Sequence, residues 1–263
     1  MDSRTRSRLI ELNHQFYQTF AQRFSATRQR LQPGVARLLA QIPCQARLLD
    51  LGCGNGKLCR SLASADFRGS YTGLDFSAKL LRLAEDACDM DAEILSGPLA
   101  GDSKPPVKKR AVFLQADLST VDWDNNLSEG SYDVILAFAV FHHLPSHELR
   151  LQTLRKAHRL LVPGGMLFHS EWQFLNSPRL RARIQPWQTI GLDESQLDPG
   201  DYLLDWRHGG YGFRYVHHFD QDELSLLAEQ SGFRIMDTFF SDGERGRLGL
   251  YQTWSTENLP PVP

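Results

Sequence analysis

The sequence predicts one large α/β domain in which helices cover both faces of a mostly parallel, doubly wound β-sheet. Three observations support this expectation. Short apolar segments of strand length alternate with helical segments along most of the chain. A glycine-rich turn, residues 52–56, follows the first apolar segment and opens a helix. Acidic residues stand at the ends of the first three predicted strands, at positions 50, 75 and 117.

Two helices are expected ahead of the sheet. Five apolar residues recur at helical spacing and predict an amphipathic helix over residues 5–24. They are Leu9, Leu12, Phe16, Phe20 and Phe24. A second helix, over residues 35–41, is bounded by prolines on both sides.

Strands and helices then alternate. Strands are predicted at residues 47–51, 70–74, 112–115, 132–138, 166–171, 234–240 and 248–254, and helices at residues 57–65, 78–88, 146–161 and 221–231. Asp220 and Glu223 have the spacing of a capping box at the start of the last helix. Residues 89–110 are polar and predict a surface loop, whereas residues 172–219 interrupt the alternation and are rich in Gly, Arg, Trp and Tyr.

These boundaries divide the chain into three parts. Residues 1–44 are expected to form a helical arm or lid, residues 45–256 the α/β domain, and residues 257–263 a flexible, proline-rich tail. Within the domain, residues 172–219 are expected to cap the substrate side of the site.

Composition is that of an ordinary globular protein. Of the 263 residues, 41% are apolar and 23% are charged, and no apolar run is long enough to span a membrane, so no membrane association is expected. The four cysteines form no C-x-x-C pair, which argues against a zinc knuckle or a redox dithiol. No apolar secretory segment stands at the N-terminus, and these features together indicate the cytoplasm.

Positive charge is unevenly distributed. Residues 1–47 hold eight arginines but two acids, and further basic clusters stand at residues 104–110 and 179–183. Solvated helix faces explain such clusters in many proteins, and an anionic substrate such as RNA is the alternative. Both interpretations remain open.

The segment Asp50-Leu51-Gly52-Cys53-Gly54-Asn55-Gly56 joins the first strand to its helix. Glycines permit the tight turn and let a ligand approach the backbone closely. A dinucleotide-binding loop needs a later third glycine, at the position of Lys57, and Asp50 would repel a pyrophosphate at the helix N-terminus. The same carboxylate attracts an ammonium group. S-adenosylmethionine has an ammonium, a sulfonium and no phosphate, so it fits this loop better than NAD does.

Two further acids follow the next two strands. Asp75, in Asp75-Phe76-Ser77, is placed to accept hydrogen bonds from both ribose hydroxyls. Asp117 is placed to accept from the amine of adenine, with Leu118 donating a backbone N–H. Each acid has an alternative role as a helix cap. Because all three acids meet at the carboxyl edge of the sheet, where open α/β folds bind ligands, the set predicts a cofactor site.

Taken together, these segments resemble the motifs of the class I (Rossmann-like) S-adenosylmethionine-dependent methyltransferases. Residues 50–56 resemble their first motif, Asp75 the second, Asp117-Leu118 the third, residues 132–144 the fourth, and residues 161–165 the turn before their fifth strand. The match covers residues 45–172, and it implies a seven-stranded sheet of order 3-2-1-4-5-7-6 with an antiparallel seventh strand. It also implies S-adenosyl-L-methionine as cofactor. The residues implied to bind it are Asp50, Gly52, Cys53, Gly54, Asn55, Gly56, Asp75, Phe76, Ser77, Asp117, Leu118, Ala137 and Phe138.

A narrower resemblance concerns the methyl acceptor. Residues 24–28, 139–143 and 214–219 are similar to segments of the eukaryotic methyltransferases that esterify carboxymethyluridine at the wobble position of tRNA. The chain departs from them in its extra loop at 89–110 and in Gln-Arg-Leu-Gln-Pro at 29–33, where an aromatic-proline pair is usual. The resemblance implies a role in tRNA modification, and it leaves a small activator subunit open as a partner.

Methyl transfer from a sulfonium is an in-line displacement, to which the protein contributes position and desolvation. A carboxylate nucleophile is already ionised and needs cationic or hydrogen-bonding partners, for which Arg28, His142 and Arg214 are the candidates. A hydroxyl or amine nucleophile needs a base, for which His142 or His143 is the candidate; a purely structural role for these histidines is the alternative. Adjacent histidines are poor ligands for one metal ion and no cysteine lies near them, so no metal site is expected.

The arm is expected to lie across the carboxyl edge of the sheet, with its apolar stripe over the cofactor and its other face toward the acceptor. Arg28, at its end, is then expected to hold the acceptor, because a guanidinium grips a carboxylate or phosphate through two parallel hydrogen bonds. His217 and His218 face opposite sides if they lie in a strand, so at most one of them reaches the site.

Three other functions remain open. The chain is alternatively a small-molecule O- or N-methyltransferase, or a cofactor-binding regulatory module without catalysis. The intact acids and glycines of the loop argue for cofactor binding in either case. The third alternative is a nicotinamide-dependent oxidoreductase. Asp50 argues against it, because its carboxylate would repel the pyrophosphate of the cofactor.

Overall fold

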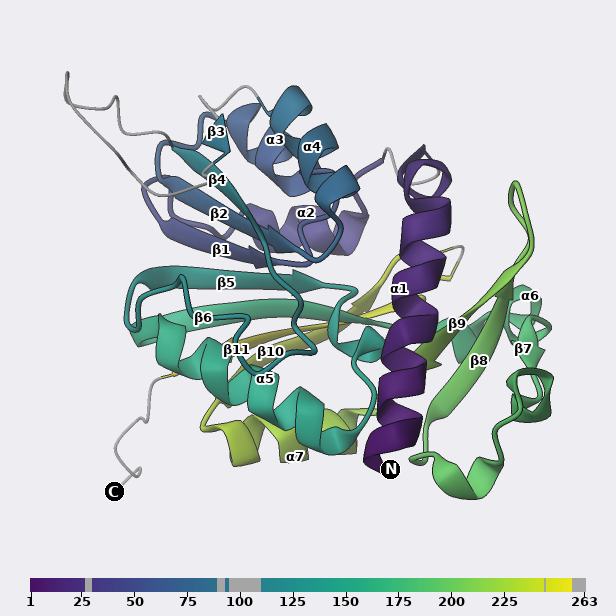
Figure 1. Ribbon diagram of the computed structural model, residues 1–263. Coiled ribbons are helices and arrows are strands. Elements are labelled where there is room, and N and C mark those ends of the chain that lie inside the picture. The colour runs from purple at the N-terminus through teal and green to yellow at the C-terminus, as the bar shows by residue number, and fades with distance from the viewer. Residues whose placement is uncertain (27–29, 89–92, 95–109, 244, 257–263) are drawn as a thin grey trace, which may run out of the picture.

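The computed structural model describes residues 1–26, 30–88, 93–94, 110–243 and 245–256. At its centre lies an eight-stranded sheet in the order β10-β11-β6-β5-β1-β2-β4-β3 (Figure 1). Neighbouring strands are parallel except for β11, which is antiparallel to both β6 and β10. The strands are β1 (Arg47–Leu51), β2 (Ser70–Asp75), β3 (Glu93–Ile94), β4 (Ala111–Gln115), β5 (Tyr132–Phe138), β6 (Leu161–Trp172), β10 (Arg234–Ser241) and β11 (Gly249–Ser255).

The seven predicted strands lie in the order that the family resemblance implies, 3-2-1-4-5-7-6, with the last strand antiparallel. The eighth strand, β3, is a correction. It falls within residues 89–110, which were expected to form a loop throughout, and it pairs in parallel with β4 at the edge of the sheet. A strand of two residues is too short to produce a recognisable alternation in sequence. The rest of that segment lies outside the described residues.

Helices cover both faces of the sheet, as expected for a doubly wound domain (Figure 1). One set comprises α2 (Pro33–Leu39), α3 (Lys57–Ala63) and α4 (Ala78–Ala87), and the other α5 (His147–Leu160) and α7 (Gln221–Ser231). Each set buries aliphatic side chains in its own hydrophobic cluster against the sheet. Half of the capping box expected for α7 is present: Asp220 accepts a hydrogen bond from the backbone N–H of Glu223 at 2.8 Å, whereas the side chain of Glu223 contacts Arg150 and His217. No described helix is both long and apolar enough to cross a bilayer.

Residues 172–219 build a second, smaller sheet that was not predicted from the sequence. Its antiparallel strands are β7 (Ile184–Gln185), β8 (Asp201–Trp206) and β9 (Gly212–His217), in that order. Short helical segments connect it to the large sheet: α6 (Pro178–Arg181) and the 3₁₀ turns η2 (Phe174–Asn176), η3 (Trp187–Ile190) and η4 (Glu194–Gln196). A further 3₁₀ turn, η1 (Phe141–His143), follows β5. The many aromatic and glycine residues of this segment obscure the alternation of its strands.

The N-terminal helix, α1 (Ser3–Ala26), stands between the two sheets and runs across the carboxyl edge of the large one (Figure 1). Its position agrees with the expectation, but the direction of its apolar stripe does not. Leu9 packs with residues of the small sheet, and Phe16 and Phe20 pack on Trp206 of β8. The unpredicted small sheet therefore buries the stripe that was expected to cover the cofactor.

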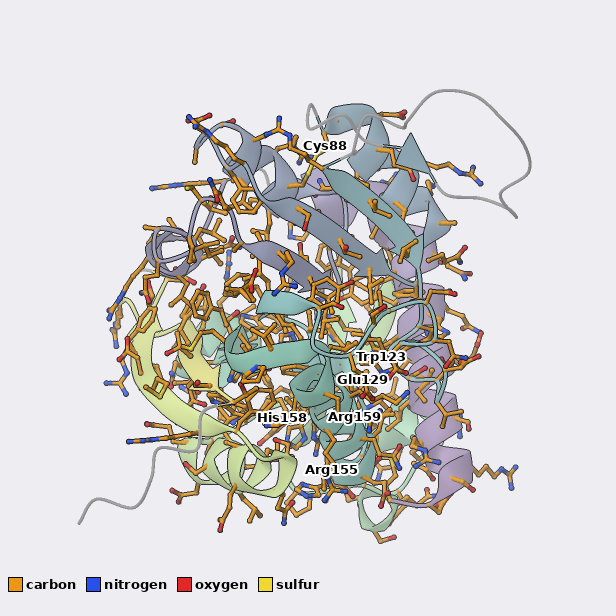
Figure 2. All side chains as sticks on the ribbon, turned by 90° about the vertical axis from the view of Figure 1, so that its left-hand side faces the viewer. Cys88, Trp123, Glu129, Arg155, His158 and Arg159 are labelled. Atoms are coloured by element: carbon orange, nitrogen blue, oxygen red, sulfur yellow. A yellow bond between two sulfur atoms is a disulfide. The ribbon has the colours of Figure 1, made fainter. Side chains whose placement is uncertain are left out.

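Two of the four cysteines form a disulfide. Cys59, on α3, pairs with Cys88, which follows the last turn of α4 (Figure 2). The bond joins the helix that begins after the glycine loop to its neighbour on the same face of the sheet. Cys53, within the loop, is a buried thiol, and Cys44 is exposed.

Candidate functional site

A cavity of about 660 Å³ opens at the carboxyl edge of the large sheet. The ends of β1, β2, β4, β5 and β6 form its floor, and α1 and the segment 172–214 form its walls. Such an edge is where open α/β sheets bind ligands. Three neighbouring strands, β4, β2 and β1, bring the acids and the glycine loop together here, because Asp75 pairs with Gln115 and Asp50 pairs with Gly73.

The glycine loop has the backbone conformation that the sequence predicts. Gly52 and Gly56 have positive φ angles of 68° and 70°. A Cβ at Gly52 would come within 2.9 Å of Val140, and one at Gly56 within 2.8 Å of Ala84. Side chains are excluded at both places, so the loop lies close to its neighbours and presents backbone to the cavity.

Asp50 is almost completely buried at the end of β1, with 1% of its surface exposed. The hydroxyl of Tyr71 donates a hydrogen bond to its Oδ2. Burial raises the pKa of Asp50 to about 7, because the ionised form loses its hydration. A cationic ligand group beside this carboxyl would favour ionisation again, which fits the ammonium predicted for this position.

Asp75 lies at the end of β2 and already accepts two backbone hydrogen bonds. The N–H of Gly54 donates to Oδ2 at 2.9 Å, and the N–H of Ser77 donates to Oδ1 at 2.8 Å. Burial raises the pKa of Asp75 to about 6, and the two backbone bonds oppose that rise. Each carboxylate oxygen has a second acceptor position, so two ribose hydroxyls can still be bound.

Asp117, after β4, contacts the N-terminal helix. Its Oδ2 lies 3.1 Å from Nε2 of His14, and its Oδ1 accepts hydrogen bonds from the N–H and hydroxyl of Ser119 at 2.9 and 2.7 Å. Burial raises the pKa of Asp117, but these bonds outweigh it and the pKa is lower than usual. The ring of His14 also stacks on Phe76, with ring centroids 4.7 Å apart. One side chain of α1 thus touches two residues that were expected to bind the cofactor.

Most of the predicted cofactor residues line the cavity. They are Asp50, Gly52, Cys53, Gly54, Asn55, Asp75, Phe76, Asp117, Leu118 and Phe138. Gly56, Ser77 and Ala137 lie behind this lining: Gly56 packs against α4, Ser77 caps α4, and Ala137 is fully buried in β5. His14 and Tyr17, which were not among the predicted site residues, line the cavity from α1. Their polarity beside the apolar stripe was the available signal.

The opposite side of the cavity is basic and aromatic. Arg214, on β9, is buried, and its guanidinium carbon lies 4.7 Å from the ring centroid of Trp172 and 6.0 Å from that of Trp206. Burial lowers the pKa of Arg214, and nearby Arg183 lowers it further, whereas Tyr17 opposes the shift. Two cations therefore face one space, which favours an anion between them.

His142 and Arg214, two of the three predicted catalytic residues, line this cavity. The third, Arg28, lies outside the described residues. His142 is buried in η1, and its Nδ1 lies 3.1 Å from Oε2 of Glu171 at the end of β6. The adjacent His143 contacts the hydroxyl of Tyr17 at 2.7 Å through Nε2. Glu171 was missed, although the rule that selected the other acids, a carboxylate closing a buried strand, applies to it as well.

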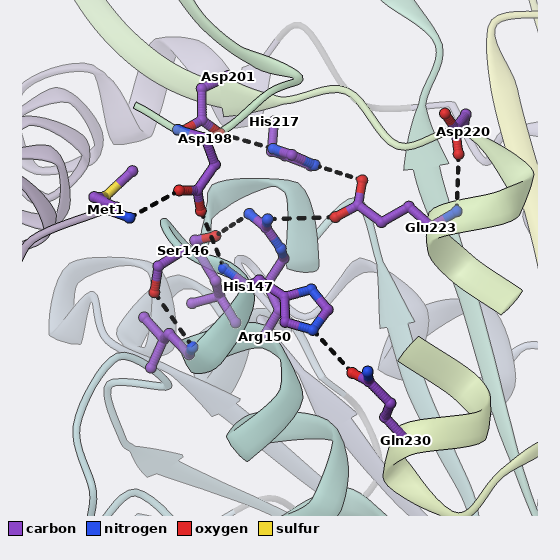
Figure 3. Close-up of polar contacts among 12 residues, drawn as sticks. Met1, Ser146, His147, Arg150, Asp198, Asp201, His217, Asp220, Glu223 and Gln230 are labelled. Atoms are coloured by element: carbon purple, nitrogen blue, oxygen red, sulfur yellow. Dashed lines mark hydrogen bonds and ion pairs between the residues drawn. The ribbon is translucent and has the colours of Figure 1, made fainter. Parts of the chain in front are cut away.

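His217 and His218 do not line the cavity. His217 is buried in a polar network, with Nδ1 2.7 Å from Asp201 and Nε2 2.8 Å from Glu223 (Figure 3). Nη2 of Arg150 lies 3.3 Å from Oε1, the other carboxylate oxygen of Glu223. These contacts connect β8 and β9 to α5 and α7, so His217 holds the small sheet on the domain. His218, beyond the end of β9, contacts Phe174 instead.

A family model described as a methyltransferase domain matches residues 21–238. This range includes the whole glycine loop, every strand-end acid described above, and Arg214. It also extends through the small sheet, so the match is not confined to the cofactor half of the cavity.

Two relatives have different named substrates. The tRNA (carboxymethyluridine(34)-5-O)-methyltransferase of Schizosaccharomyces pombe is 28% identical over 244 residues, which cover 86% of this chain and 90% of that protein. The 27-O-demethylrifamycin SV methyltransferase of Amycolatopsis mediterranei is 32% identical over 144 residues, which cover 54% of this chain and 45% of that protein.

Solved structures share the fold. An S-adenosylmethionine-dependent methyltransferase from Methanosarcina mazei aligns with a TM-score of 0.61 and 23% identity, covering 86% of this chain and 97% of the other. A methyltransferase from Haloferax volcanii, in complex with the Trm112 methyltransferase activator, aligns with a TM-score of 0.62 and 16% identity, covering 94% and 98%. At these identities the likeness concerns the fold alone.

Proposed function

The chain belongs to the S-adenosylmethionine-dependent methyltransferases, and from this premise we propose that it methylates a carboxylate, that of a carboxymethylated uridine in tRNA. The observation that carries the proposal is the basic, aromatic half of the cavity. Arg214 is buried there between two tryptophans, with Arg183 close by. A buried guanidinium of this kind is suited to a planar anion.

The residues of the other half fit S-adenosylmethionine as the cofactor. Asp50 offers a buried carboxyl to an ammonium, Asp75 offers acceptors to two hydroxyls, and the glycine loop leaves room for a close approach. Because S-adenosylmethionine has no phosphate, its binding needs no cation to hold one. Once bound, the cofactor supplies an electrophilic methyl group on a sulfonium.

Catalysis then depends on how the chain holds the acceptor. A carboxylate is ionised at neutral pH, so no proton has to be removed before transfer. Arg214 is proposed to hold one carboxylate oxygen and orient the other toward the methyl group, while Trp172 and Trp206 exclude water. Alignment and desolvation are the main contributions of a protein to such a displacement.

The proposed acceptor is tRNA for two reasons. The relative from S. pombe, named for tRNA carboxymethyluridine, matches most of this chain and most of its own length. In addition, Arg179, on α6, and Arg183, in the turn between α6 and β7, line the same cavity. Phosphate contacts of this kind position a nucleic acid without reading its sequence. Residues 172–219 are accordingly proposed to cap the acceptor side.

We also propose that the enzyme works in the cytoplasm with a small activator subunit. A tRNA acceptor implies that compartment, where Cys59 and Cys88 would be kept as thiols. The Haloferax volcanii methyltransferase, which was solved with its activator bound, shares the fold of 94% of this chain. Co-purification of a small protein with the tagged chain is expected.

The decisive experiment uses tRNA carrying an unesterified carboxymethyluridine and methyl-labelled S-adenosylmethionine, with and without the activator. Transfer to this tRNA is expected, and the label should be released as methanol by mild alkali, because an ester hydrolyses and an N-methyl group or an ether does not. The matched control is the same tRNA carrying unmodified uridine. Alkali-stable label, or no transfer in the presence of the activator, would contradict the proposal.

A small-molecule acceptor is the second candidate. The relative from Amycolatopsis mediterranei favours it, because it shares 32% identity and is named for O-methylation of a rifamycin. Free carboxylic acids and phenols in the same labelled assay separate the two candidates. Transfer to these compounds at a higher kcat/KM than to tRNA would establish the second.

A further inference from the structure

Glu171 occupies an unusual position between two histidines. Its side chain is completely buried at the end of β6. Oε2 lies 3.1 Å from Nδ1 of His142, and Oε1 lies 3.2 Å from Nδ1 of His169. The backbone N–H of His142 also donates to this carboxyl group. His142 lines the cavity, so the state of Glu171 decides what His142 offers to an acceptor.

His169 determines the direction of the hydrogen bonds. It is fully buried, and burial lowers its pKa to about 3, so the ring is neutral and has one N–H. Its Nε2 has no hydrogen-bond partner among the residues that the structure describes. A proton on Nε2 would therefore leave a buried donor unsatisfied, which is costly. The proton belongs on Nδ1, which donates to Oε1 of Glu171.

Glu171 has no strong cation beside it. Its ion-pair contacts in the described part of the chain are with the two histidines. Arg150 acts on it only at a distance, because that guanidinium bonds to Glu223, Tyr215 and the carbonyl of Leu144. Burial raises the pKa of Glu171 well above its usual value. Since Oε1 already accepts from His169, the acidic proton is on Oε2, where it faces Nδ1 of His142.

We propose that Glu171 is a neutral acid that donates to Nδ1 of His142, so that His142 has its own proton on Nε2. His142 is then a hydrogen-bond donor toward the acceptor and not a base. The functional consequence of this inference rests on the proposed function. If the acceptor is an ionised carboxylate, the N–H of His142 and the guanidinium of Arg214 bind it together. Glu171 is a positioning residue, because it acts through His142.

The first test needs neither cofactor nor acceptor. Nitrogen-15 spectra of the full chain, labelled at histidine, report which ring nitrogen of each imidazole is protonated. His142→Gln identifies the signals of His142. The expected result at pH 7 is a protonated Nε2 and a bare Nδ1 for His142, and the reverse for His169. A protonated Nδ1 on His142, in the neutral or the doubly protonated ring, would overturn the proposal whatever the substrate proves to be.

The second test compares two substitutions of Glu171. The amide in Glu171→Gln donates to Nδ1 of His142 through one atom and accepts from His169 through the other, as the neutral acid does. Glu171→Ala removes both bonds. Glu171→Ala is expected to raise the KM for the acceptor about tenfold, the loss of one hydrogen bond to a charged group, with a smaller change in kcat. Glu171→Gln is expected to have a KM for the acceptor close to that of the wild type.

The spectrum of Glu171→Gln completes the test. The His142 signals should keep the wild-type pattern, because the amide replaces the acid without a change of charge. If Glu171→Gln instead moves the proton of His142 to Nδ1, the proposal fails. If the spectra are as expected but no carboxylate is methylated, the proposed function fails and the assignment of Glu171 stands.

Discussion

At the scale of single residues, the cofactor half of the cavity depends on carboxyl groups that the fold removes from water. Asp50 has a pKa of about 7 and Asp75 a pKa of about 6, both raised first by burial. Each is therefore partly protonated near neutral pH. The neutral acid has no charge with which to attract an ammonium group.

Cofactor affinity is consequently expected to fall as the pH drops through 7. Calorimetry with S-adenosylhomocysteine, which has the same ammonium, should give a Kd about tenfold weaker at pH 6 than at pH 8, because a carboxyl group with a pKa of about 7 is mostly protonated at pH 6 and mostly ionised at pH 8. In Asp50→Asn the binding should be weak at both pH values. A wild-type Kd that is equal at the two pH values would show that Asp50 does not face the ammonium.

The acceptor half of the cavity is proposed to depend on the guanidinium of Arg214, and substitution by lysine tests this. Arg214→Lys keeps the charge but loses the planar pair of donors, so methyl transfer is expected to fall about tenfold or more. Binding of S-adenosylhomocysteine should stay within about twofold of wild type, since Arg214 lies on the other side of the cavity. Arg28→Lys is predicted to behave in the same way.

The matched control is Arg181→Lys, in the same basic cluster but outside the cavity lining, which should leave both quantities unchanged. Full activity of Arg214→Lys would remove that residue from the acceptor site. Loss of cofactor binding in Arg28→Lys would place that residue against the cofactor.

At the scale of elements, α1 connects the two halves of the cavity. One face packs on the small sheet, and His14 on the other face reaches Asp117. The hydrogen bond to Asp117 is the largest of the influences that raise the pKa of His14. Since the folded state favours the protonated ring, this contact stabilises the docked helix fully below about pH 6.5, and the stabilisation is lost as the pH rises through the raised pKa.

Hydrogen exchange of the α1 backbone, corrected for the intrinsic effect of pH, is expected to show this loss. Protection should be lower at pH 8.5 than at pH 6 in the wild type, and equal at the two pH values in His14→Asn. His158→Asn, on α5 and far from α1, is the control and should behave as the wild type. An α1 that is equally protected at both pH values in the wild type would mean that the ion pair does not dock it.

At the scale of the whole molecule, one covalent bond crosses the α3–α4 layer. The Cys59–Cys88 disulfide joins residues 29 apart, and closing such a loop removes entropy from the unfolded chain. Reduction of the oxidised protein is expected to lower the free energy of unfolding in urea by about 3–4 kcal/mol. A Cys59→Ala/Cys88→Ala variant should unfold at the same urea concentration with and without reductant. An oxidised protein that is insensitive to reductant would contradict the pairing.

The sequence predicts the large sheet well because its signals are local. Each strand and helix has its own periodicity, and the glycine loop and strand-end acids fix where the cofactor edge lies. The small sheet was not predicted, because β7 has two residues and because β8 and β9 are mixed with aromatic and charged residues. The disulfide was also missed, since spacing alone does not reveal which cysteines meet.

The missed site residues have a common cause. His14 and Glu171 each had a local signal in the sequence, but their roles follow from contacts across the chain, such as that of His14 with Asp117. The apolar stripe of α1 was identified correctly, but its partner was not, because the partner lies in the unpredicted sheet. Periodicity tells which face of a helix is buried and leaves open what buries it.

The packing of α1 on β8 and β9 also has a consequence for synthesis of the chain. Asn13 accepts a hydrogen bond from the backbone N–H of Tyr215, 202 residues later in sequence. At about 5–20 residues per second, a ribosome needs about 10–40 seconds to make the intervening chain. For most of that time the nascent helix displays Leu9, Phe16 and Phe20, because their partners Trp187, Leu203 and Trp206 are made late. Although α1 is made before both sheets, it is therefore among the last elements to reach its native place, and a chaperone that binds apolar helices has that interval in which to act.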